Sequence, residues 1–202
     1  MAYRDFKLTD IQQKFGIDTI FANIWEKETI LEIEPSDFLK QSLNFADLIP
    51  LTTEKALSER LLAPILAEVK SRNADKIQIF SGETISADKS LGLNGEIDFL
   101  MVKKPYAPEP IAPIIAITEA KVGRLDKAIP QAAAQMIGAR VFNQNYGEKI
   151  DLIYGVVTDG NSWRFLMLKE NQVLVDNTRY SLTEINKILG IFQYIIDSYR
   201  VD

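Results

Sequence analysis

The chain has 202 residues, of which 47% are hydrophobic and 25% charged, and its formal net charge is −5. This length and composition fit one globular domain, or a domain with a small appendage, and exclude a disordered chain. The sequence contains no cysteine and no histidine. Disulfide scaffolds, thiolate nucleophiles, Ser-His-Asp triads and histidine-ligated metals are therefore excluded. The remaining chemistry uses carboxylates, lysine, arginine and hydroxyl groups, and oxygen ligands favour Mg²⁺ or Mn²⁺.

The sequence gives no sign of a membrane segment or an export signal. No apolar run approaches the roughly 18–20 residues that a membrane span needs. The first ten residues, MAYRDFKLTD, are charged from the start and have no apolar core. We therefore expect a cytoplasmic protein that does not associate with membranes. The acidic net charge argues against a large nucleic-acid footprint, because phosphate binding depends mainly on Lys and Arg, but it leaves room for a local basic groove.

The first quarter of the chain has weak patterns. We expect a short helix over 11–15, and a second helix over 37–43 with Ser36 as its N-cap. Since nothing else in residues 1–50 is regular, we treat this part as an N-terminal extension of unclear structure. The main domain is then 51–202.

A longer helix is predicted over 54–72, with Thr52 or Thr53 as its N-cap. Pro64 lies inside it and predicts a kink or an early break, because proline removes a backbone donor and clashes with the preceding turn. The apolar residues of this segment follow helical spacing: Leu57, Leu61, Ile65 and Val69.

From residue 76 the apolar residues alternate with a period of two, which indicates β-strands. Pro130 is compatible with a helix only in its first turn, and the last helix, capped by Ser181, has one apolar face. The order of helix, three strands, helix, two strands and helix predicts an α/β fold with a mixed sheet between layers of helices. The predicted strands are 76–80, 95–103, 114–121, 151–158 and 163–168, and the middle helix is 125–145.

The polar end of the strand over 114–121 holds the residues that could carry chemistry. Glu119 and Lys121 are two positions apart, so a strand places both side chains on one face. Asp98 lies in the preceding strand, where antiparallel pairing could bring it opposite. Two carboxylates and a lysine on one sheet face suit metal-assisted phosphodiester hydrolysis. The carboxylates hold a divalent cation, and the lysine activates water and offsets developing negative charge.

The acid-x-base spacing alone is a weak signal. Chance predicts about three such triplets in a chain of this composition, and the sequence has three, at Asp5/Lys7, Glu68/Lys70 and Glu119/Lys121. Only the third ends a β-type run. The alternative interpretation is a cross-strand salt bridge at a sheet edge, worth less than about 1 kcal/mol.

The segments GEIDF, from Gly95 to Phe99, and ITEAK, from Ile117 to Lys121, resemble the PD-(D/E)xK nuclease superfamily. The resemblance implies a three-layer restriction-endonuclease-like fold, with a central mixed sheet flanked by helices. It implies that Asp98, Glu119 and the backbone carbonyl of Ala120 bind Mg²⁺, for which Mn²⁺ can substitute, and that Lys121 is the catalytic lysine. Ile97 departs from the pattern, because the name motif has proline before the aspartate.

Other segments extend the resemblance over about 53–198, so that 51–202 becomes the nuclease-like domain. The helix after the motif, with its segment QAAAQM, offers Gln131 and Gln135 on one face as catalytic-site residues. The helix before the sheet resembles that of restriction-type members, and its Glu54 would be either an additional metal ligand or part of a solvated helix face. The segment YGVVTDGNSWRF resembles the closing hairpin of bacterial, mainly cyanobacterial, members.

The resemblance implies a nuclease that hydrolyses DNA phosphodiester bonds and leaves 5′-phosphate and 3′-hydroxyl ends. The alternative is the same fold used as a non-catalytic nucleic-acid-binding or protein-interaction module, or as an accessory subunit that cuts only with a partner. A homodimer is a further open alternative, with the last helix as its seam instead of as core. The remaining candidates are a basic rim of Arg124, Lys127 and Arg140, a solvated Glu59, and Trp163 and Phe165 as core residues.

Overall fold

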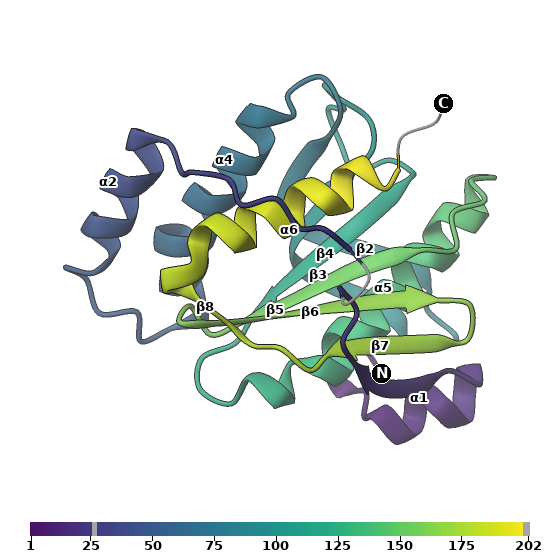
Figure 1. Cartoon of the computed structure of the whole chain (residues 1–202). Helices are drawn as coiled ribbons and strands as arrows, with labels where there is room; N and C mark the ends of the chain where they lie inside the picture. The colour runs from purple at the N-terminus through teal and green to yellow at the C-terminus, as the bar shows by residue number, and fades with distance from the viewer. Residues whose placement is uncertain (26–27, 200–202) are drawn as a thin grey trace.

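An eight-stranded mixed sheet forms the centre of the molecule in the computed structural model, which describes residues 1–25 and 28–199 (Figure 1). The strand order is β1-β7-β6-β5-β4-β3-β2, and β8 pairs with β6. The β1–β7 and β4–β5 pairs are parallel and the other pairs are antiparallel. The strands are β1 (Asp18–Ala22), β2 (Gln78–Asp88), β3 (Leu93–Val102), β4 (Ile114–Ala120), β5 (Ile153–Thr158), β6 (Ser162–Lys169), β7 (Gln172–Asp176) and β8 (Tyr180–Ser181).

Helices cover the sheet through two separate apolar cores. One core joins α5 and α1 to the sheet, and the other joins α2, α3, α4 and α6 to it. Figure 1 shows α6 crossing in front of the sheet. The helices are α1 (Leu8–Phe15), α2 (Asp37–Ala46), α3 (Glu54–Leu57), α4 (Ala63–Arg72), α5 (Ile129–Asn145) and α6 (Ile185–Asp197), with 3-10 turns η1 (Tyr3–Asp5), η3 (Leu125–Lys127) and η4 (Leu182–Glu184) and a π-helical segment η2 (Ser58–Leu62).

The two central strands are apolar because both their faces are covered. Every residue of β4 and β5 is buried, as expected for strands that have helices on both sides. The helix α5 connects these two parallel strands. Residues after the end of β4 therefore lie at the same edge of the sheet as the start of α5.

The structure confirms the predicted strands and helices of the main domain, with shifted ends. It also adds strands that were not predicted, namely β1, β7 and β8. Pro130 lies in the first turn of α5, and Ser181 caps the turn that leads into α6. The apolar stripe of α6 is buried within the chain, as are Trp163 and Phe165, so these residues are core.

The helix predicted over 54–72 is continuous, but its hydrogen bonding changes before Pro64. Thr53 caps it, with its hydroxyl oxygen accepting the Ala56 N–H at 3.1 Å. The Ala63 N–H donates to the Ser58 carbonyl, five positions earlier, in the π-helical segment η2. Wider turns of this kind accommodate a proline that would clash with a regular helix. Of the two predicted alternatives, a kink or an early break, the early break is wrong, because the helix continues past Pro64 through a local bulge.

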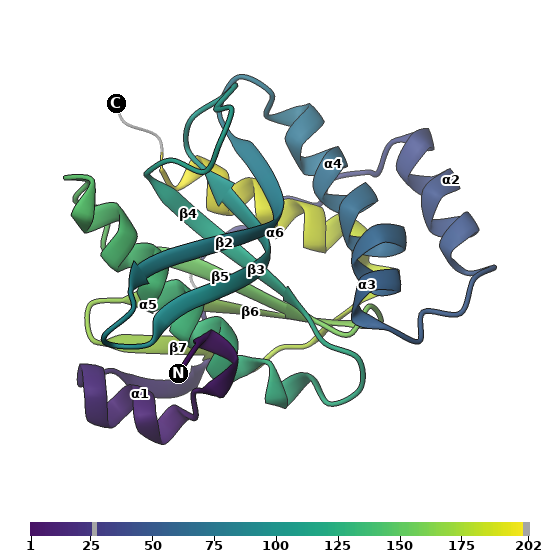
Figure 2. The ribbon, with the colours of Figure 1, turned by 180° about the vertical axis from the view of Figure 1, so that it is seen from behind.

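Residues 1–50 are integrated into the fold, and both predicted helices are present. Tyr3, Phe6 and Ile11 belong to the core under α5, and β1 pairs with β7. Ser36 caps α2, its oxygen accepting the Leu39 N–H at 3.2 Å. Figure 2 shows the N-terminal turn beside α5 and β3. These residues therefore contribute to the same sheet and the same core as the rest of the chain.

Within the described residues, none of the helices is both long enough and apolar enough to span a membrane.

Candidate functional site

Asp98 and Glu119 come together through the antiparallel pairing of β3 and β4. Phe99 of β3 pairs with Thr118 of β4. Asp98 and Glu119 are the positions next to this pair, so the two carboxylates lie on neighbouring strands. The backbone N–H of Ala120 donates to Asp98 Oδ2 at 2.7 Å, which fixes the aspartate against the end of β4. Both acids line one pocket of about 440 Å³, together with Glu54, Lys121 and Gln131. The predicted convergence is therefore present.

Lys121 follows the last residue of β4 and points into the same pocket. Its backbone N–H donates to the Thr158 carbonyl at 2.8 Å, which holds it beside the end of β5. Its Nζ lies 2.8 Å from Glu54 Oε1. The hydrogen bond that Lys121 donates to Glu54, with the charges of Glu54, Glu119 and Asp98, raises the pKa of Lys121 above its usual value. The lysine is therefore a cation at neutral pH.

Glu54 is placed as the partner of the lysine, in the first turn of α3. It is exposed and lines the pocket. Within the described residues, no group of three or more Asp or Glu side chains is arranged to hold a metal ion. The structure therefore gives Glu54 an ion pair with Lys121 and does not group it with Asp98 and Glu119 as a third ligand.

Both predicted glutamines bind Glu119 from α5. The side-chain amide of Gln131 donates to Glu119 Oε1, and that of Gln135 donates to Oε2 at 2.8 Å. The two glutamines are one turn apart, so they share a helix face. Gln135 is fully buried, and its Oε1 has no hydrogen-bond partner among the described residues. The glutamines thus hold both oxygens of Glu119 in place.

The charge of Lys121 and the hydrogen bonds to the two carboxyl groups offset only part of the cost of burying them together. Glu119 is only 3% exposed. Burial, and next the charge of Asp98, raise its pKa to about 8. Burial also raises the pKa of Asp98, helped by the charges of Glu54 and Glu96, although the Ala120 N–H opposes the shift. Buried acids with raised pKa values that share a pocket are typical of functional sites.

This arrangement fits a divalent cation. Four carboxylates line the pocket, from Glu54, Glu96, Asp98 and Glu119, against two basic side chains, Arg4 and Lys121. The formal balance of these lining groups is four negative and two positive charges, a net of −2. Mg²⁺ commonly binds one or two carboxylates and keeps several waters. Asp98 and Glu119 match that pattern, whereas Ala120 is not among the residues that line the pocket.

Some predicted residues lie away from this pocket. Arg140 lies nine residues beyond Gln131 on α5, a rise of about 13 Å along the helix axis, so it is far from the pocket. Its Nη1 donates instead to the carbonyl of Glu170 at 2.5 Å. Its assignment to a basic rim is wrong. Arg124 and Lys127 are exposed in the connection between β4 and α5. Glu59 is exposed and lies 3.8 Å from Lys55.

The structure adds lining residues that the sequence interpretation missed. Glu96 lies two positions before Asp98, and strand periodicity would have placed it on the same face. Ala2, Tyr3 and Arg4 also line the pocket. No local pattern indicates their position, because it depends on packing between the start of the chain, β3 and α5.

A further charged cluster lies beside the connection to α5. Asp126, in η3, accepts hydrogen bonds from Arg164 at 3.3 Å and Arg179 at 3.0 Å. Arg164 on β6 is only 6% exposed. These contacts tie η3 to the edge formed by β6 and β8.

Comparison with known proteins adds no relative: no family model matches the chain, and no curated protein matches it.

Proposed function

We propose that this chain is a divalent-metal-dependent nuclease of the restriction-endonuclease-like fold, which hydrolyses phosphodiester bonds in DNA in the cytoplasm. The observation that carries the proposal is the convergence of Asp98, Glu119 and Lys121 in one pocket. Glu119 is buried there with amide donors and no basic partner within hydrogen-bond distance among the described residues. Two features support the fold assignment: helices pack against a mixed sheet, and a helix joins the parallel strands β4 and β5.

The chain's own groups have distinct roles in this proposal. Asp98 and Glu119 would hold Mg²⁺ or Mn²⁺. When bound, the ion polarises a phosphate oxygen and lowers the pKa of a water. Gln131 and Gln135 orient Glu119, so that its oxygens stay directed into the pocket.

Lys121 supplies the positive charge next to the reacting phosphate. Its ammonium group donates hydrogen bonds to the attacking water or to a phosphate oxygen, and it offsets the negative charge that develops there. Glu54 holds the ammonium group at 2.8 Å and keeps it protonated, because it raises the pKa of the lysine. Lys121 therefore acts as an electrostatic donor rather than as a general base.

The test compares two variants that separate metal binding from cleavage. Lys121→Ala should bind Mn²⁺ with nearly unchanged affinity, yet cleave DNA about 100–1,000-fold more slowly, the usual cost of removing one transition-state donor. Asp98→Asn should lose both cleavage and Mn²⁺ binding, because it removes an anionic oxygen ligand from a hard cation. Cleavage is measured on single- and double-stranded DNA with Mg²⁺ or Mn²⁺, and Mn²⁺ binding by calorimetry.

Lys149→Ala is the control, since Lys149 is exposed near the opposite end of β5, and it should cleave like wild type. A wild-type protein that is inert on both substrates with either metal would favour the non-catalytic module. Cleavage that persists in both site variants would show that the activity comes from another site or a contaminant.

A further inference from the structure

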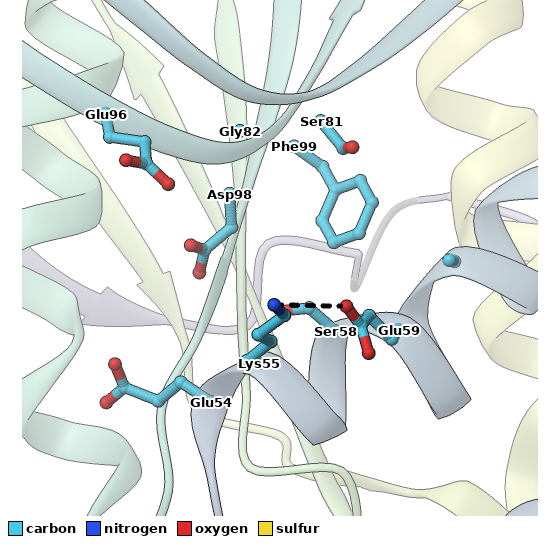
Figure 3. A pocket seen from close by; sticks show the side chains of 10 residues that line it. Glu54, Lys55, Ser58, Glu59, Ser81, Gly82, Glu96, Asp98 and Phe99 are labelled. Carbon is cyan, nitrogen blue, oxygen red and sulfur yellow. Dashed lines mark ion pairs between the residues drawn. The ribbon is translucent and has the colours of Figure 1, made fainter.

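The pocket that holds Asp98 and Glu119 continues into a second one. The neighbouring pocket, of about 530 Å³, is lined by residues of α3, η2, α4, β2 and β3. The two pockets share Glu54, Glu96 and Asp98, so together they form one trough with Asp98 near its middle. Figure 3 shows Asp98 and Glu96 extending from β3 toward the side on which α3 carries Glu54 and Lys55.

Among the described residues, Arg4 and Lys55 are the basic groups of this trough with the longest and most exposed ion pairs. Lys121 lies 2.8 Å from Glu54, and Lys55 lies 3.8 Å from Glu59. The guanidinium of Arg4 lies 3.9 Å from Asp5 Oδ1, and its side chain is 83% exposed. The other oxygen of Asp5 is engaged, since it accepts the Ala2 N–H at 2.8 Å. The positive charge of Arg4 is therefore available to an incoming anion.

The backbone that carries Arg4 is fixed, although its side chain is exposed. Tyr3 is 1% exposed and lies against α5 and β3. A Cβ at Gly138, in the middle of α5, would overlap the Tyr3 hydroxyl oxygen, and one at Gly95 would crowd its ring. Glycine inside a helix costs about 1 kcal/mol relative to alanine. Here it leaves room for Tyr3 and so sets the position of Arg4 at the pocket.

We propose that Arg4 binds a backbone phosphate of the nucleic acid, next to the phosphate that is cleaved. The proposal rests on the proposed nuclease function, and it adds the N-terminal turn to the substrate-binding surface. The centre of the trough is acidic, so a phosphate strand is attracted there only with a cation present. The phosphates on either side need protein cations, and Arg4 is fixed at one side of the carboxylates. A guanidinium suits phosphate oxygens, because it offers paired donors.

Binding of a fluorescein-labelled DNA oligonucleotide tests this directly, measured by anisotropy in Mg²⁺ over a range of salt concentrations. A Lys121→Ala background slows cleavage during the measurement. Adding Arg4→Ala should weaken binding about 5- to 10-fold. It should also reduce the slope of log affinity against log salt by about 0.7–0.9, the value for one lost phosphate contact. Adding Lys149→Ala should change neither quantity.

Two further variants separate the charge of Arg4 from its position. Arg4→Lys should recover most of the salt slope, because it keeps the charge. Gly138→Ala keeps the arginine but displaces Tyr3, and should weaken DNA binding as Arg4→Ala does. A melting curve checks that Gly138→Ala is folded. In the cleavage-competent background, Arg4→Ala should raise KM more than it lowers kcat.

The outcomes distinguish this proposal from the nuclease proposal. Cleavage by wild type, with DNA affinity and salt slope equal in Arg4→Ala and Lys149→Ala, overturns the role of Arg4 and leaves the nuclease intact. Arg4-dependent binding by a wild type that never cleaves supports the phosphate contact and overturns the nuclease. Absence of any DNA binding overturns both.

Discussion

Glu68 and Glu119 are two buried glutamates of this chain, 5% and 3% exposed, and each is followed two positions later by a lysine. Glu68 lies in α4 and is fully paired. Arg72 Nε donates to its Oε1 at 2.8 Å, and the Ser36 hydroxyl donates to its Oε2 at 2.6 Å. Burial alone would raise the pKa of Glu68, but the donors from Ser36 and Arg72 outweigh it, and the pKa is lowered.

Glu119 has a second carboxyl group where Glu68 has an arginine. Its direct donors are neutral amides, and the neighbouring Asp98 adds repulsion to the effect of burial, so its pKa is raised to about 8. The protein itself therefore offsets the buried charge of Glu68, whereas Glu119 requires a proton or a cation from outside. This difference separates a structural acid from a candidate metal ligand.

The largest expected effect on stability is a pH dependence that belongs to Glu119. Its pKa is about 8 in the folded protein and about 4.3 in an unfolded chain. The folded state therefore holds a proton that the unfolded state releases, and the free energy of unfolding falls as pH rises from about 5 to about 8. At about 1.4 kcal/mol for each pKa unit, the loss is on the order of 4 kcal/mol, or roughly 10 °C in melting temperature.

Melting curves of the metal-free protein measure this effect, and the absence of histidine leaves few ordinary titrations in the same window. Glu119→Gln should remove most of the slope, whereas Glu68→Gln should retain it. If Glu119→Gln keeps the slope, the two acids do not differ in the way that their surroundings indicate.

The next effect is stabilisation by metal. Mg²⁺ at about one hundred times its dissociation constant should stabilise the wild type by about 2.7 kcal/mol, which is roughly 5–10 °C. The shift should be larger at about pH 8 than at about pH 6, because the ion and a proton compete for the same carboxyl groups. Glu119→Gln should abolish the shift, and Glu68→Gln should preserve it. A shift that survives Glu119→Gln would place the ion elsewhere.

The sequence predicted the parts of the site that depend on local periodicity. Acid-x-lysine spacing brings two side chains to one face only on a strand, so Glu119 and Lys121 meet in the pocket. On a helix the same spacing separates them: Lys70 instead donates to the Ile77 carbonyl at 2.7 Å, while Glu68 binds Arg72, four positions away. Strand or helix context therefore decided which triplet forms a site.

The missed parts of the molecule depend on contacts between distant segments. The parallel pairing of β1 with β7 joins residues more than 150 positions apart, and such short strands have no strong pattern of their own. The place of Tyr3 in the core depends on Gly138, which alone looks like an unfavourable helix residue. Arg4 reaches the pocket only through this packing, so no spacing in the sequence indicates it.

The smallest expected effect is the loss of stability in Glu68→Gln, which tests the structural role of Glu68. Glu68→Gln keeps an oxygen acceptor but removes the charge that Arg72 pairs with, at 2.6 Å. A buried charged hydrogen bond is worth about 1.5–3 kcal/mol. The Arg72 side chain is 37% exposed and stays partly hydrated, so we expect a loss of about 1–2 kcal/mol near neutral pH, measured by chemical denaturation. Glu59→Gln, whose partner Lys55 is exposed at 3.8 Å, is the matched control and should change stability by less than about 0.5 kcal/mol.

The pH dependence of this loss has the opposite sign to that of Glu119. Because the pKa of Glu68 is lowered in the folded protein, its contribution is present above the unfolded value of about 4.3 and is lost as pH falls through the folded value. Wild type and Glu68→Gln should therefore converge in stability on acidification, while wild type and Glu119→Gln diverge as pH rises toward about 8. A Glu68→Gln protein that is more stable than wild type at neutral pH would mean that Arg72 and Ser36 do not offset the burial of this carboxylate, and the contrast between the two glutamates would fail.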